Sequence, residues 1–147
     1  MNKRKNRLNF DNAGWTFMET LIVMAIVLLL TVSVGFSASR QLDRAKVVSA
    51  QSQISAFCLA LDTYYIDNGF YPSESQGLDA LWQKPSGEPY PSFWNGPYVS
   101  KKIPKDPWGN DYVYYSGRSA LPYTVKSFGR DGCEGGTGYE SDVSSED

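Results

Sequence analysis

The sequence predicts an α+β fold in which one long N-terminal helix packs on a small antiparallel β-sheet. No proline occurs between Trp15 and Tyr71, and this stretch is first apolar and then has the three-and-four spacing of an amphipathic helix. The second half of the chain instead holds turns rich in Pro and Gly and two short runs of Tyr and Val. A chain of 147 residues has room for one folded domain beside such a helix, but not for two.

A basic leader precedes an uncharged apolar segment. Residues 1–14 contain four Lys or Arg and one Asp, a net charge of +3, and Leu21 to Ser39 contain no charge. This length fits the roughly 20 residues that cross a bilayer, whereas a cleaved secretory signal has an apolar core of about 7–15 residues. A retained transmembrane helix over residues 15–38 is therefore preferred. The leader predicts a cytoplasmic N-terminus, with the domain of residues 39–147 on the other side of the membrane.

The helix is expected to continue beyond the membrane with one apolar face. The residues at helical spacing on this face are Val47, Ala50, Ile54, Phe57, Cys58, Leu61, Tyr64 and Tyr65. We expect this face to pack on the domain. Asn68-Gly69, with Pro72 just beyond, predicts the end of a helix of about 50 residues.

Short elements are predicted after the helix. Ser73 and Gln76 have the spacing of a capping box, which indicates a short helix through Leu78, Leu81 and Trp82.

A loop rich in Pro and Gly follows at residues 85–98. Asp-Pro-Trp-Gly-Asn at residues 106–110 is a turn signal. A strand is predicted at residues 112–115, with an antiparallel partner at residues 123–128.

The composition argues against two classes of function. The chain has no His, the usual general base at neutral pH, and we find no phosphate-binding loop and no Ser or Cys set beside a base, so an enzyme is not expected. Residues 15–147 have a net charge of −5, which argues against nucleic acid as a partner of the folded part.

Glu19 is an acid near the front of the predicted membrane helix. A charge at the bilayer centre costs about 2.5–3.5 kcal/mol or more, and less near an end. Glu19 either reaches water at the interface or pairs with a cation. A cut between Gly14 and Trp15 would create an α-amino group one helical turn away, on the same chain or on a neighbouring one. Such a pair controls register more than stability.

The segment AGWTFMETLIV, residues 13–23, resembles the class III prepilin motif of type IV pilins and pseudopilins. The resemblance implies that a prepilin peptidase cuts after Gly14 and methylates the amine of Trp15, which stands where Phe is commonest. It also implies that Glu19 is an assembly residue, paired with the Trp15 amine of a neighbouring subunit. Phe36 occupies a position where family members often have Pro.

Longer motifs resemble the major pseudopilins of type II secretion systems. DNGFYP, QGLDAL, GPY and KDPWGN occur in this order, followed by SFGRDGCEGGTG, and the similarity runs from Ala13 to about Val143. The resemblance implies a type IV pilin-like fold. Many copies are expected to form a helical homo-oligomer, the periplasmic pseudopilus, which drives export of folded proteins across the outer membrane.

The same resemblance implies the partners and the location. The partners are the prepilin peptidase, minor pseudopilins, an assembly ATPase and its inner-membrane platform, with no nucleic acid. The subunit is expected in the inner membrane as a single-pass protein with a periplasmic domain. A type IV pilin, or another pseudopilin for adhesion or DNA uptake, is the alternative.

The acidic C-terminal segment has two interpretations. Clustered carboxylates are typical of a solvated tail, but calcium takes six to eight oxygen ligands, and the spacing is not that of an EF-hand. The resemblance favours calcium, because major pseudopilins bind it in this loop. It assigns the following residues: the acids Asp131 and Asp142, the carbonyls of Phe128 and Arg130, and Ser141 in place of an acid, with Glu140, a carbonyl or water as compensation.

The two cysteines also leave an alternative open. A disulfide between Cys58 and Cys133 is permitted outside the cytoplasm, provided that their Cα atoms approach within about 4.4–6.8 Å. Two free thiols, with Cys58 as a small core residue, are preferred.

Overall fold

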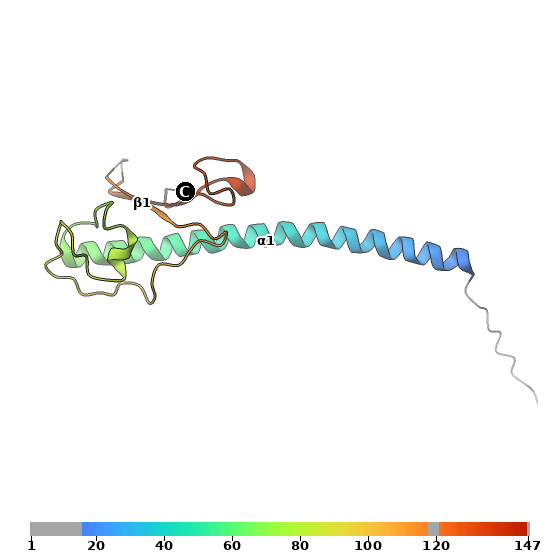
Figure 1. Cartoon of the computed structure of the whole chain (residues 1–147), viewed down its shortest axis with the longest axis horizontal. Helices are drawn as coiled ribbons and strands as arrows, with labels where there is room; N and C mark the ends of the chain where they lie inside the picture. The colour runs from blue at the N-terminus through green and yellow to red at the C-terminus, as the bar shows by residue number, and fades with distance from the viewer. Residues whose placement is uncertain (1–15, 118–120, 147) are drawn as a thin grey trace, which may run out of the picture. The chain divides into compact units, whose positions relative to one another are not determined.

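One long helix and a three-stranded antiparallel sheet make up the regular structure of the chain. The computed structural model describes residues 16–117 and 121–146, apart from the side chains of residues 33–38 and of Tyr139. The elements are α1 (Phe17–Asn68), the 3₁₀ turn η1 (Leu78–Leu81), β1 (Val113–Ser116), β2 (Tyr123–Ser127), the 3₁₀ turn η2 (Gly138–Glu140) and β3 (Val143–Ser144). The predicted α+β fold is confirmed (Figure 1).

Helix α1 is a single helix of 52 residues that continues through Gly35 and Phe36 without interruption. It ends where the sequence predicts. Gly69 has a φ of +80°, which favours glycine, and its N–H donates to the carbonyl of Tyr65 at 2.7 Å. The chain divides between Ser39 and Arg40 into two compact units.

The first half of α1 exposes its apolar side chains. From Phe17 to Val32 the large apolar residues are between 41% and 77% exposed. Within the described residues, no helix has a stretch long and apolar enough to cross a membrane. The predicted leader, Trp15 and the side chains of residues 33–38 lie outside the described residues.

The second half of α1 packs one face into the core. The buried core residues are Ala50, Ile54, Phe57, Ala60, Leu61 and Tyr64 of α1, Leu78, Ala80 and Leu81 of η1, and Tyr114, Val125 and Val143 of the sheet. The predicted apolar face is therefore largely confirmed. Tyr65 is the exception, because it lies about 100° around the helix from Tyr64 and is 45% exposed. Its ring stacks on that of Tyr71, with centroids 4.7 Å apart.

The capping-box hydrogen bonds form, but they close the turn of residues 73–77 and do not cap the element that follows, whose N-cap is Gly77 without a side-chain bond. The Ser73 N–H donates to Oε1 of Gln76 at 3.0 Å, and the Gln76 N–H donates to Oγ of Ser73 at 3.4 Å. The element that follows is the 3₁₀ turn η1, which ends before Trp82. This turn contributes the buried residues Leu78 and Leu81 to the same core as α1.

The sheet has the strand order β1-β2-β3, and both pairs are antiparallel. The predicted hairpin is confirmed, although β1 begins one residue later than expected and β2 ends one residue earlier. Strand β3 was not predicted, because two residues are too short to show an alternating pattern. Its pairing is extended by the Ser145 N–H, which donates to the carbonyl of Val125 at 2.9 Å.

Candidate assembly and calcium-binding regions

The predicted assembly residue Glu19 lies in the first turn of α1. Thr16 stands at the N-cap position, and its Oγ1 accepts the Glu19 N–H at 3.3 Å. An acid in a first turn also interacts favourably with the helix dipole. The Glu19 side chain is exposed, and because the bond to Thr16 is made by the backbone N–H, that bond does not depend on the carboxylate. Gly14 and Trp15, the predicted cleavage and methylation residues, lie outside the described residues.

Asp106 organises the Asp-Pro-Trp-Gly-Asn turn from inside the protein. Its side chain is almost fully buried, with 5% of the residue exposed. Oδ1 accepts the backbone N–H groups of Trp108 at 3.0 Å and Asn110 at 2.8 Å. Oδ2 accepts the hydroxyl of Ser127, at the end of β2, at 2.6 Å. The sequence indicated the turn, but not that its first residue joins the turn to the sheet.

The same turn supports the start of the acidic loop, residues 128–142. Nδ2 of Asn110 donates to the carbonyl of Gly129 at 2.9 Å. A Cβ on Gly132 would lie 3.3 Å from the Asn110 amide, so the loop backbone passes close to that side chain. Residues 105–110 and the acidic loop are therefore one connected structure.

Glycines bring the two ends of the acidic loop together. Gly129 has a φ of +64°, and a Cβ there would meet the Ser141 carbonyl oxygen at 2.9 Å. Gly136 has a φ of +87°, and a Cβ there would clash with the Glu140 carbonyl oxygen. Side chains at either position would push these carbonyls away. The Glu140 and Ser141 carbonyls are thus backbone oxygens that the fold gathers at the neck of the loop.

The two predicted acid ligands each accept backbone N–H groups in the structure. Oδ1 of Asp131 accepts the Cys133 N–H at 3.2 Å. Both carboxylate oxygens of Asp142 accept the Gly135 N–H at 3.1 Å. Asp131 is exposed and Asp142 is half-buried. These bonds hold the loop turns, and they leave lone pairs on both carboxylates.

The other predicted ligands lie at the ends of the same loop. Phe128 is half-buried directly after β2, and Arg130 is exposed in the turn that follows. Ser141 follows η2 at the C-cap position, and its hydroxyl donates to the Asp142 carbonyl at 3.4 Å. Glu140 is exposed in η2. Serine brings no charge to the position where the family pattern has an acid.

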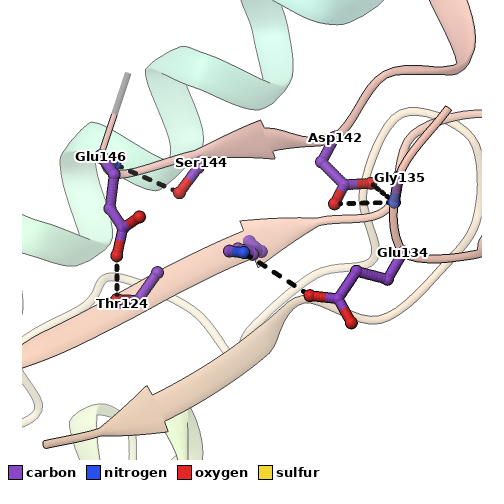
Figure 2. A network of polar contacts seen from close by, with 7 residues as sticks. Thr124, Glu134, Gly135, Asp142, Ser144 and Glu146 are labelled. Carbon is purple, nitrogen blue, oxygen red and sulfur yellow. Dashed lines mark hydrogen bonds and ion pairs between the residues drawn. The ribbon is translucent and has the colours of Figure 1, made fainter. Parts of the chain in front are cut away.

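Two further acids of this region are bound to the sheet, which the sequence did not indicate. Figure 2 shows Glu146 beside Thr124, whose hydroxyl donates to Oε1 of Glu146 at 2.7 Å. Oε1 of Glu134 lies 3.7 Å from Nζ of Lys126, which belongs to β2. Because these acids have partners and β3 joins the sheet, the segment is not a solvated tail.

The donor set of the loop fits calcium in kind. It offers two carboxylates and several carbonyls, all of them oxygen ligands, on a backbone that glycines allow to turn tightly. Within the described residues, no group of three or more Asp, Glu or Cys side chains is placed to hold a metal. A calcium site here would therefore depend on backbone carbonyls and water as much as on acids.

Both cysteines are free thiols in the structure, as preferred from the sequence. Cys58 lies half-buried on α1, and burial raises the pKa of its thiol. The hydroxyl of Tyr123 contacts the Cys58 carbonyl at 3.4 Å and Oδ1 of Asp62 at 3.2 Å. Burial is also the main cause that raises the pKa of Tyr123. Cys133 is exposed in the acidic loop.

Comparisons with known proteins agree with this architecture. The model of the family described as type II secretion system protein G matches residues 38–146. The type II secretion system core protein G of Pseudomonas aeruginosa is 41% identical over 133 residues, which cover 90% of this chain and 94% of the relative. The protein of the same name from Vibrio cholerae is 38% identical and covers 88% of each chain.

A solved structure has the same fold. It is the crystal structure of the major pseudopilin from the type 2 secretion system of enterohaemorrhagic Escherichia coli. It matches with a TM-score of 0.61 and 33% identity, over 70% of this chain and 88% of that one. With a family match over most of its length and relatives above 30% identity at high coverage, the chain belongs to the type II secretion system protein G family.

Proposed function

We propose that this chain builds the shaft of a periplasmic pseudopilus as a helical homo-oligomer. The observation that supports this most is the family match, which spans the second half of α1 and the whole sheet. Family membership makes the chain a structural subunit of the type II secretion pseudopilus and not an enzyme. The pseudopilus drives export of folded proteins across the outer membrane.

The first half of α1 has a proposed role both before and after assembly. Before assembly, it anchors the subunit in the inner membrane, with the leader in the cytoplasm and the domain in the periplasm. After assembly, it packs against the stems of other subunits. The exposed apolar side chains from Phe17 to Val32 suit both environments. Exchange of lipid for another apolar stem has no large hydrophobic cost, so small packing and charge terms decide assembly.

Glu19 supplies such a charge term in this proposal. After a cut at Gly14, the amine of Trp15 on one subunit pairs with the Glu19 carboxylate of the next. In an apolar surrounding the pair is favourable, whereas either charge alone is costly. The pair therefore sets the axial register of an incoming subunit.

The remaining partners follow from the machine to which the family belongs. A prepilin peptidase would remove the leader and methylate Trp15. An assembly ATPase and its inner-membrane platform would extract subunits from the membrane, and minor pseudopilins would begin the filament. These assignments rest on the family and on the N-terminal motif.

We also propose that calcium stabilises the acidic loop. Asp131 and Asp142 would provide the charge, and the carbonyls of the loop would complete the coordination. The folded neck of the loop, where the Glu140 and Ser141 carbonyls meet Gly136 and Gly129, supports this proposal. Bound calcium would offset the repulsion between the acids.

Two measurements in the native host test the proposed function. Intact-mass analysis should give a chain that starts at Trp15 and has one added methyl, because residues 1–14 are removed. A mature chain that begins near Arg40 would instead indicate an ordinary signal peptide. Deletion of the gene should leave exported proteins in the periplasm, and the unaltered gene should restore their export. Intact export after deletion, together with fibres outside the cell, would favour an adhesive pilin.

A further inference from the structure

The solvent-facing side of the second half of α1 has no charge over a long stretch. Residues 47–61 contain no Asp, Glu, Lys or Arg on any face, although the exposed side of a surface helix normally has charged residues. On this side Val48, Leu59 and Ile66 are 65%, 71% and 79% exposed. At 100° per residue, the three lie within about 20° of one another around the helix and opposite the buried face.

Small residues separate these large side chains, and the hydroxyls of two of them are already bonded. The Ser55 hydroxyl donates to the Gln51 carbonyl at 2.9 Å, and the Thr63 hydroxyl donates to the Leu59 carbonyl at 2.8 Å. Both hydroxyl protons therefore point into the helix itself. We call Val48, Ser52, Ser55, Leu59, Thr63 and Ile66 the back face of α1. Asp62 borders this face between Leu59 and Ile66, about 60° and 40° from them around the helix, and its Oδ1 accepts the hydroxyls of Tyr71 and Tyr123 at 3.2 Å. From Val48 to Leu59 the face has no charge, so another apolar group can approach it there without removing an ion from water.

A second uncharged apolar surface lies at the tip of the loop of residues 85–98. Tyr90 and Phe93 are 61% and 76% exposed, and residues 89–100 contain no charge. We call residues 90–93 the loop tip. Exposed aromatic side chains of this kind are enriched among the anchors of protein–protein interfaces.

The loop tip is held in place from both sides. Nε2 of Gln76 donates to the Pro89 carbonyl at 2.9 Å. The Phe93 N–H donates to Oδ1 of Asn68 at 3.3 Å, at the end of α1. Pro91, between the two aromatic residues, is fully buried. Because the backbone is already ordered, docking of Tyr90 and Phe93 loses little further conformational entropy.

The two surfaces face different directions on one molecule. Asn68, which binds the loop, is two residues after Ile66 and therefore about 200° around the helix from it. The loop tip and the back face are thus unlike patches on opposite sides. When unlike patches pair, the contact is heterologous and propagates into an open helical filament, whereas a pair of like patches closes into a dimer.

We infer that the loop tip of one subunit docks on the back face of α1 in the next subunit, with Phe93 against Leu59. This inference rests on the proposed function, because it needs neighbouring copies in a filament. Two aromatic side chains bury about 150–250 Å² each when they are fully covered. A stable complex buries about 800 Å² on each partner, so this contact does not hold a dimer alone. It acts together with the stems, and it positions the domains along the filament.

Cysteine cross-linking in the full chain tests the inference. Phe93→Cys and Leu59→Cys are combined in one chain that also has Cys58→Ser and Cys133→Ser, and filaments are oxidised before denaturing electrophoresis. Because every copy has both partners, the expected product is a ladder of dimers, trimers and longer species. Each single cysteine variant should stay monomeric. Leu121→Cys with Leu59→Cys is the matched control, since Leu121 is exposed but belongs to neither surface, and it should give no ladder.

The outcomes separate this inference from the proposed function. Filaments that form with accessible thiols but give no ladder overturn the inference alone, and so do dimers from Phe93→Cys by itself. Absence of filaments from the unaltered chain refutes the proposed function as well. If the cysteine pair does not assemble, Phe93→Ala and Leu59→Ala are compared with Leu121→Ala. We expect at least a tenfold loss of filaments for the first two and none for the third, with unchanged melting temperatures; equal yields from all three overturn the inference.

Discussion

Replacement of Asp106 by Ala should destabilise the domain more than any surface substitution. Its carboxylate is buried and accepts three hydrogen bonds, from the N–H groups of Trp108 and Asn110 and from the hydroxyl of Ser127. The Ala variant leaves all three donors without this acceptor and also leaves a small void. The turn of residues 105–110 then loses its link to β2, and Asn110 loses its fixed position under the acidic loop.

The expected magnitude follows from these three bonds. A buried donor left without a partner costs about 1–3 kcal/mol. The Ser127 hydroxyl is fully buried, while Trp108 and Asn110 are half-buried, so that water compensates part of their loss. A total of about 3–5 kcal/mol is expected, a large share of the roughly 5–15 kcal/mol that stabilises an ordinary domain. Asp111→Ala is the control, because its ion pair with Lys105 is exposed and should contribute less than about 1 kcal/mol.

Urea unfolding of residues 40–147, followed by tryptophan fluorescence, measures this difference. All of the core residues lie within this fragment, so it is expected to fold without the first half of α1. The Ala variant at Asp106 should have a much lower midpoint at an unchanged slope, and the Ala variant at Asp111 should resemble the unaltered fragment. If the two variants are equally stable, the buried carboxylate is not the link between turn and sheet that we describe.

Three other predictions concern the stem, the acidic loop and the aromatic core. Glu19→Ala should insert into membranes at least as well as the unaltered chain but should form few filaments, and Glu19→Gln should do the same. Insertion and filament yield are scored separately, and a normal filament yield from both variants would exclude the docking role of Glu19. Calcium at a hundredfold excess over its Kd should stabilise residues 40–147 by about 2.7 kcal/mol. Asp142→Ala should abolish most of the calcium-dependent shift in melting temperature, and Glu146→Ala should keep that shift. If millimolar calcium does not change the melting temperature, the proposed site is wrong. Tyr64→Phe should be neutral or stabilising by about 1 kcal/mol, because among the described residues its hydroxyl is the buried side-chain group that has no partner. Tyr114→Phe should cost about 1 kcal/mol, because its hydroxyl donates to a backbone carbonyl at 2.8 Å. If thermal melts rank the two variants in the reverse order, this account is wrong.

The sequence by itself determined those features whose signals lie within a few residues of one another. The end of α1 depends on Gly69 directly after Asn68, and the capping box depends on Ser73 and Gln76, three residues apart. Helical spacing identified most of the core face, because a helix repeats every 3.6 residues whatever it packs on. The ordered motifs around residues 67–138 identified the family for the same reason, since they are contiguous in the chain.

The tertiary structure alone decided the contacts between distant residues. The Asp106 carboxylate meets the Ser127 hydroxyl 21 positions away, and Glu146 meets Thr124 22 positions away. Strand β3 exists only because β2 offers a free edge on which two residues can pair. No local propensity encodes such partners, because each is selected by the folded position of the other. Glu146, which the sequence alone places in a candidate solvated tail, is therefore bound to the sheet in the fold.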